Sequence, residues 1–306
     1  MRQAIRAMLV VVVLGVLVGV GLFSAQNYLE QRVARTVDAR LAELPAQLEG
    51  GYRAVTVNPL ERTAAVHDLR LIGEGLFPDV RVRRVSIREY SGGAIAPERL
   101  RVRLHDVYWV RGGWPQTLDF LETALNGPVV GDMTLDMRFD HDTRALTIDE
   151  ASVELHSGDR LALRGRFYLQ PTGVLDHPYD GPLSGLELVK LQGQWRDHGL
   201  FVGILEQLGR ERGMTGRTLA ANMLGELDWA VAEWDDPDLD ASLESLRGFV
   251  QVPGELDLRM ALGDPVNMVL LGERFLVDPP SAIRHLSPQL DYTAPQRDAN
   301  RTVTID

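Results

Sequence analysis

Apolar side chains recur at every second position along most of the chain after residue 52, and this alternation constrains the fold more than any other feature. In the clearest run Leu161, Leu163 and Phe167 alternate with arginines. A strand points successive side chains to opposite faces, so each such run predicts a strand with one apolar face. Strands of this kind in series are typical of antiparallel sheets, whereas parallel strands of doubly wound folds are apolar on both faces. The runs cover residues 80–88, 100–104, 133–139, 146–155, 161–169, 186–195 and 256–262.

The period changes to that of a helix between residues 198 and 250. Apolar residues follow helical spacing over 200–208, 219–234 and 239–250, and Gly213, Gly216 and the acidic run 235–238 separate these segments. The sequence therefore predicts a mainly β domain of the α+β class. We expect a curved antiparallel sheet or groove with a helical insertion at about 198–250.

A stretch of 23 residues without charge, Ala7 to Leu29, precedes this domain. As a helix it measures about 34 Å, enough to cross a hydrocarbon layer of about 30 Å. Arg2 and Arg6 precede it, so the positive-inside rule predicts a cytoplasmic N-terminus at 1–6, a transmembrane anchor at 7–29 and the bulk of the chain across the membrane.

A cleaved signal peptide is the alternative to an anchor, because a charged start followed by an apolar run also describes a secretory signal. Cleavage after Ala25 places Phe23 at a position that prefers a small residue, and the apolar run is longer than the apolar region of an ordinary signal peptide. The uncleaved anchor is favoured, and the sequence leaves cleavage open.

An amphipathic stalk helix is predicted over residues 30–50. Its apolar stripe consists of Leu29, Val33, Val37, Leu41, Leu44 and Leu48. The stripe fits a short coiled coil or docking helix, or a helix that packs on the domain it introduces, and the second interpretation is favoured. The β-rich domain is then expected at 51–292 and a flexible tail at 293–306, where the sequence is polar and lacks periodicity.

Charge and motifs exclude several classes of function. With 43 acidic and 32 basic residues the net charge is −11, so the overall positive field that nucleic-acid binding requires is missing. There is no cysteine, and the seven histidines occur singly, so no metal site is predicted. No nucleophile-elbow, P-loop, dinucleotide or zinc-protease motif is present. The sequence predicts neither an enzyme nor a cofactor.

Two sets of residues are candidates for ligand contact. The first is an apolar strand face rich in methionine and leucine, which fits acyl chains of varying shape, although an ordinary packed core is the favoured interpretation. The second is a set of arginine rows on two neighbouring strands, Arg81 with Arg83 and Arg101 with Arg103, which fits the phosphates of anionic lipid, although an ordinary solvated face is favoured. The predicted apolar lining comprises Met133, Leu135, Met137, Phe139, Leu161, Leu163, Phe167, Leu169, Leu256, Leu258 and Met260.

The order of these features resembles the AsmA-like proteins of the Gram-negative envelope. The resemblance rests on the single anchor, the opening strands at 55–60 and 66–71, and the run 139–148 that precedes Gly165, Arg166 and Phe167. It covers about half of the chain and lies in hydrophobic rhythm and hairpin spacing. It implies a membrane-anchored, β-rich periplasmic groove concerned with lipid transport or outer-membrane upkeep, and it brings no catalytic residues.

The expected function is therefore lipid binding or transfer, or support of outer-membrane biogenesis, by a single-pass protein of the bacterial inner membrane with its bulk in the periplasm. The expected partners are the membrane, phospholipid or lipopolysaccharide, and an envelope protein. The alternative is a structural or interaction subunit of an envelope assembly or secretion machine that has no lipid ligand.

Overall fold

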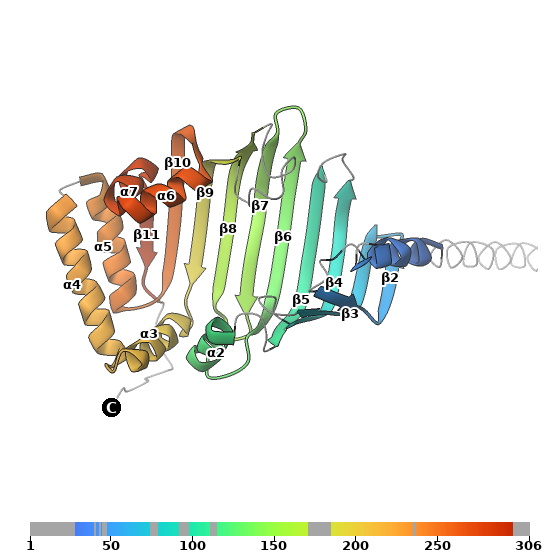
Figure 1. Cartoon of the computed structure of the whole chain (residues 1–306), viewed down its shortest axis with the longest axis horizontal. Helices are drawn as coiled ribbons and strands as arrows, with labels where there is room; N and C mark the ends of the chain where they lie inside the picture. Colours follow the sequence, from blue (N-terminus) through green and yellow to red (C-terminus); the bar gives the residue numbers. More distant parts are fainter. Residues whose placement is uncertain are drawn as a thin grey trace, which may run out of the picture. The chain divides into compact units, whose positions relative to one another are not determined.

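The protein is mainly β: within the residues that the structure describes, eleven strands form an open antiparallel sheet that is accompanied by helices (Figure 1). The computed structural model describes residues 28–39, 41–42, 44, 48–73, 79–91, 98–110, 115–170, 185–234 and 237–295. The described residues form two compact units. The first contains 28–89 and 102–110, and the second contains 90–101 and 115–295 within the described ranges.

The first unit is a small sheet. Its strands are β1 (Leu48–Gly51), β2 (Ala54–Asn58), β3 (Thr63–Gly73), β4 (Asp79–Ser91) and β5 (Arg99–Val110), of which the last two also extend into the second unit. The order is β1-β3-β4-β5, and β2 also pairs with β3. Its interior contains Ala65, Val66, Val82, Val85 and Val107, which are all buried.

The predicted stalk helix occupies 28–39 and lies on the first unit. Glu30 Oε1 accepts a hydrogen bond from Val57 N at 3.2 Å, and the Tyr52 hydroxyl donates to Asp38 Oδ1 at 2.8 Å. Burial and the Asp38 hydrogen bond raise the pKa of Tyr52. The prediction that this helix packs on its own domain is confirmed. Its predicted extent to residue 50 is wrong, because Leu48–Gly51 forms strand β1 against β3.

The second unit carries the larger sheet, in the order β6-β7-β8-β9-β10-β11 with every neighbouring pair antiparallel. Its strands are β6 (Val130–Asp140), β7 (Ala145–Leu155), β8 (Arg160–Leu169), β9 (Leu186–Arg196), β10 (Glu255–Asn267) and β11 (Gln289–Thr293). Its helices are α2 (Pro115–Ala124), α3 (Leu200–Glu211), α4 (Gly216–Trp234), α5 (Pro237–Gln251), α6 (Met268–Val277) and α7 (Pro279–Leu286). The β6–β7 hairpin turn is closed by Asp140, whose Oδ1 accepts from the backbone N–H of Asp142 at 2.9 Å.

The predicted helical insertion is present as α3, α4 and α5, which lie between β9 and β10. Three further helices were not predicted. Of these, α6 and α7 follow β10, which continues beyond the predicted run 256–262, through an irregularity between Ala261 and Val266, to Asn267. The predicted tail begins one residue too early, since Thr293 still pairs with Glu255 in β11.

Among the described residues, no helix combines the length and the apolar character needed to span a bilayer. The predicted anchor lies almost entirely outside the described residues, as do the N-terminus at 1–6 and residues 296–306 of the predicted tail.

Candidate ligand-binding face

One face of the second unit's sheet is apolar along every strand. Directly opposed residues of antiparallel strands point to the same side of a sheet, so the register assigns each residue to a face. All eleven residues of the predicted lining share one face. The register shows this directly for ten of them, and Leu169 joins them because it lies two positions after Phe167 on β8, opposite Leu186. Read from β6 to β10, four rows are Met133, Val153, Leu161, Trp195, Leu256; Leu135, Ala151, Leu163, Gly193, Leu258; Met137, Ile148, Gly165, Leu191, Met260; and Phe139, Leu146, Phe167, Leu188.

A bulge in β7 keeps this face continuous. Leu146 and Ile148 occupy even positions, whereas Ala151 and Val153 occupy odd ones, so a regular strand would turn one pair away. The register with β8 shifts between Ile148 and Ala151, which absorbs one extra residue and returns both pairs to the same side. A similar shift at Val189 in β9 adds Leu191 and Trp195 to the face, and the sequence prediction did not include these two residues.

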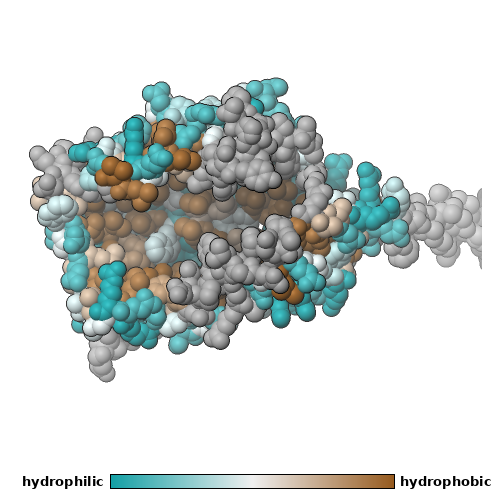
Figure 2. Space-filling view, in the orientation of Figure 1, coloured by the Kyte–Doolittle hydropathy of each residue, from teal (hydrophilic) through white to brown (hydrophobic). Residues whose placement is uncertain are grey.

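The apolar face is only partly covered. Leu161, the second residue of β8, is 48% exposed, and the other apolar residues of this face in β7 and β8 are each partly exposed. A face covered by a second layer would bury such side chains almost completely. Figure 2 shows the result as a hollowed brown area over β8, β9 and β10, bordered by α6 and α7 on one side and by α3 on the other.

Helices α6 and α7 form one border of this hollow. Leu271 of α6 and Ala282 and Leu286 of α7 are buried against Leu188 and Met260 of the sheet. Asn267 caps α6 by accepting from Val269 N at 3.0 Å, and Asp278 caps α7 by accepting from Ser281 N at 3.2 Å. These caps fix where the two helices begin, and so where the border lies along the sheet edge.

Helices α3 and α5 form the other border, through an aromatic cluster. The ring of Phe249 lies 4.9 Å from Trp195 and 5.1 Å from Phe201, measured between centroids, and Phe249 is 1% exposed. Ser242 joins α5 to β11, because its hydroxyl donates to Pro288 O at 2.7 Å and accepts from Leu290 N at 3.1 Å.

A pair of carboxylates positions the start of α3. Asp159, which is 2% exposed, accepts from His198 N at 2.7 Å and from Leu200 N at 3.2 Å. Asp197 accepts from Phe201 N at 2.7 Å. Burial raises the pKa of Asp197, and the nearby Asp159 raises it further, although the hydrogen bonds from Phe201 and Gly199 act in the opposite direction.

Serine, histidine and aspartate therefore meet at this turn, but not in the geometry of an activated nucleophile. The Ser157 hydroxyl donates to Asp159 Oδ2 at 2.5 Å, and Asp159 Oδ1 receives the backbone N–H of His198. A serine nucleophile needs its hydroxyl to donate to a general base such as a histidine ring. The arrangement observed holds the turn that leads into α3.

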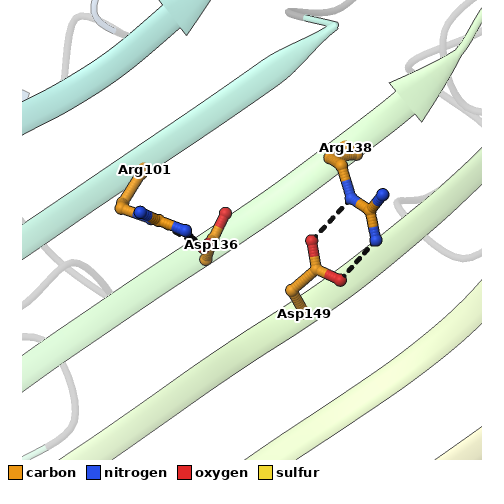
Figure 3. Close-up of polar contacts among 4 residues, drawn as sticks. All are labelled: Arg101, Asp136, Arg138 and Asp149. Atoms are coloured by element: carbon orange, nitrogen blue, oxygen red, sulfur yellow. Dashed lines mark hydrogen bonds and ion pairs between the residues drawn. The ribbon is translucent and has the colours of Figure 1, made fainter.

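The opposite face of the same sheet is polar (Figure 3). Arg101 binds Asp136 through Nε, at 2.7 Å from Oδ2, and through Nη2. Arg138 binds Asp149 through two hydrogen bonds of 2.7 and 2.6 Å, which hold the pKa of Asp149 below its usual range. Asp136 and Arg138 alternate with the apolar residues of β6, so these ion pairs lie on the side of β6 away from the apolar face.

The four predicted headgroup arginines lie on neighbouring strands, Arg81 and Arg83 on β4 and Arg101 and Arg103 on β5. Arg101 contacts the buried carboxylate of Asp136 in the second unit. Arg81, Arg83 and Arg103 belong to the first unit and are exposed, and Arg83 Nη1 lies 3.3 Å from Asp106 Oδ2. The sequence pattern indicated strand faces correctly but carried no information about which acidic partner each arginine would meet.

Comparison with protein families gives one match. A family model described as "Uncharacterized protein" matches residues 124–293, which is more than half of the chain. The chain belongs to this family. The matched region begins at the end of α2 and ends with β11, so the family shares the strands and helices that build the apolar face. Comparison with curated proteins and with solved structures found no match.

Proposed function

We infer that the protein binds the acyl chains of a lipid on the apolar face of its second unit. The observation that carries this proposal is the half-exposed Leu161 on the central strand, β8, of a face whose residues are apolar on every strand from β6 to β10. An exposed apolar area of this kind is unfavourable in water unless a ligand or partner covers it. Acyl chains are a suitable ligand, because the face supplies van der Waals contact and the polar groups of its strands are already paired.

The proposal includes the predicted membrane tether. The uncharged stretch from Ala7 to Leu29 and the preceding Arg2 and Arg6 support a location in the bacterial inner membrane, with a cytoplasmic N-terminus and the described units in the periplasm. An AsmA-like role in lipid transfer or outer-membrane biogenesis is consistent with a tethered apolar face. Reporter fusions made after residue 50 test the orientation, since they should be active only on the exported side.

Lipid retention tests the binding proposal directly. The full chain is purified in mild detergent, and the extracted phospholipid is counted per chain by mass spectrometry. Leu161→Gln together with Leu163→Gln should lose the phospholipid that the unmodified chain retains, because both polar amides lie on the apolar face. Arg164→Gln is the matched control, since Arg164 is exposed and points to the other side of the same strand. Equal lipid content in all three proteins would contradict the proposal, because the retained lipid would then be bound elsewhere, such as at the anchor.

One observation favours the alternative of an interaction subunit. The end of α6 presents Leu276 and Val277, which are 87% and 86% exposed. Exposed apolar pairs of this kind occur at protein contacts as well as at lipid surfaces. A chain that retains no phospholipid and binds an envelope protein through Leu276 and Val277 would support this second function.

A further inference from the structure

The first unit has a pocket of about 480 Å³ at the end of the β2–β3 hairpin. Its lining includes Asn58 and Thr63, which face each other across the hairpin, Ala65 of β3 and Arg84 of β4. The register places the side chains of Thr63 and Ala65 on the same face as Arg84, because His67 pairs with Arg84 and alternates with them. The pocket therefore opens on one face of three neighbouring strands.

Three side chains that line this pocket have donor groups without a partner among the described residues. The guanidinium of Arg84 makes neither an ion pair nor a hydrogen bond there, and the Thr63 hydroxyl makes no hydrogen bond. Asn58 uses its carbonyl Oδ1 to accept from Leu60 N at 3.1 Å and Glu61 N at 3.3 Å, so its amide N–H groups remain available within the described part of the chain. A guanidinium beside neutral donors is the usual protein environment for a phosphate group.

The pocket also contains a carboxylate that is not neutralised. Glu61 lines it and forms no ion pair with the described residues. A simple phosphate would be attracted by Arg84 and repelled by Glu61. A ligand that carries both a phosphate and an ammonium group satisfies both side chains, so charge complementarity favours a zwitterion.

The pocket lies beside the start of the 28–39 helix. Val57, which also lines it, donates to Glu30 Oε1, and Glu30 immediately follows the uncharged stretch that ends at Leu29. Leu60, in the turn at the pocket, is 81% exposed. If residues 7–29 lie in the bilayer, as the proposed function requires, the surface nearest to this pocket is the headgroup layer, where an exposed leucine beside an arginine is favourable.

We propose that this pocket binds the zwitterionic phosphoethanolamine-type headgroup of a membrane phospholipid. Arg84, Asn58 and Thr63 hold the phosphate, Glu61 holds the ammonium, and Leu60 contacts the lipid surface. This second site orients the first unit on the membrane next to the tether.

Soluble headgroups test the proposal without a bilayer. Isothermal titration of the full chain in neutral detergent compares glycerophosphoethanolamine with glycerophosphoglycerol, which has the same phosphodiester but no amine, and with inorganic phosphate. Glycerophosphoethanolamine should bind about tenfold more tightly than either. Arg84→Gln should weaken it by about tenfold or more, Glu61→Gln should remove the preference for the amine, and Arg164→Gln, an exposed arginine of the second unit, should change nothing.

Several results would overturn the assignment. They are the absence of binding, equal affinity for glycerophosphoglycerol or inorganic phosphate in the unmodified chain, and unchanged affinity in Arg84→Gln with an unaltered circular dichroism spectrum. The outcome is separable from the proposed function, because the double variant with Leu161→Gln and Leu163→Gln should still bind the headgroup while losing retained lipid. Normal lipid retention without headgroup binding would reject the pocket alone.

Discussion

Two truncations, one of a helix side chain packed on the sheet and one on the sheet's apolar face, should differ widely in cost. Phe249→Ala removes a side chain that is 1% exposed and packed between Trp195 and Phe201. Truncation of a buried phenylalanine costs about 3–5 kcal/mol, from lost transfer free energy and from the cavity that remains. Leu161→Ala removes a side chain that is already 48% exposed. Water fills the space it leaves, so only part of the transfer term is lost, about 1 kcal/mol.

Urea unfolding of the full chain in one detergent, followed by circular dichroism, measures both changes as shifts in midpoint at constant slope. Arg164→Ala, on the polar face of the same strand, should change the free energy of unfolding by less than about 0.5 kcal/mol. A cost for Leu161→Ala within about 1 kcal/mol of that for Phe249→Ala would show that the face over β8 is a filled core. The argument for an open binding face would then fail.

Three further predictions concern contacts that hold the second unit together. Arg101→Met should lower the free energy of unfolding by about 3 kcal/mol, because it leaves the buried Asp136 carboxylate without its cation. Adding Asp136→Asn should recover much of this loss in the same urea assay, and no recovery would contradict the pairing. Gly203→Ala should destabilise the fold by several kcal/mol, since a Cβ at this position of α3 collides with the Ala124 carbonyl of α2. Gly225→Ala, in the exposed part of α4, should stabilise it by about 0.5–1 kcal/mol. Similar shifts in melting temperature for both variants would refute the close approach of α3 to α2. Burial raises the pKa of Asp197 above its unfolded value, so the folded state binds the proton more tightly than the unfolded state. The free energy of unfolding should therefore fall as pH rises through the carboxyl range toward neutrality. Asp197→Asn should flatten this part of the pH profile.

The strand pattern predicted most of the second unit because alternation is a local property. The positions of Leu161, Leu163 and Phe167 determine a face whatever the strand later pairs with, and the register places all eleven predicted lining residues together. The helices α3, α4 and α5 were equally visible from their apolar spacing. The bulge in β7 was present in the sequence as a change of phase between Ile148 and Ala151, but its effect depends on the neighbouring strand.

The features that the sequence pattern did not predict depend on tertiary contacts. The strand β1 lies within an apparently helical stripe, and it pairs with β3 because Gly50 lets Leu41, Leu44 and Leu71 approach closely. The arginine rows could not be paired in advance, since Asp136 reaches Arg101 from a strand 35 residues away. The division into two units depends on contacts between distant segments, and alternation gave no sign of it.

Photocrosslinking in living cells detects directly whether acyl chains lie on the apolar face of the second unit. A photoreactive phenylalanine is placed at Leu161 or, as the matched position on the other face of β8, at Arg164. If acyl chains lie on this face, mass spectrometry of the purified chain should detect covalent phospholipid at position 161 and almost none at position 164. Equal labelling at the two positions, or none at 161, would contradict lipid binding on this face.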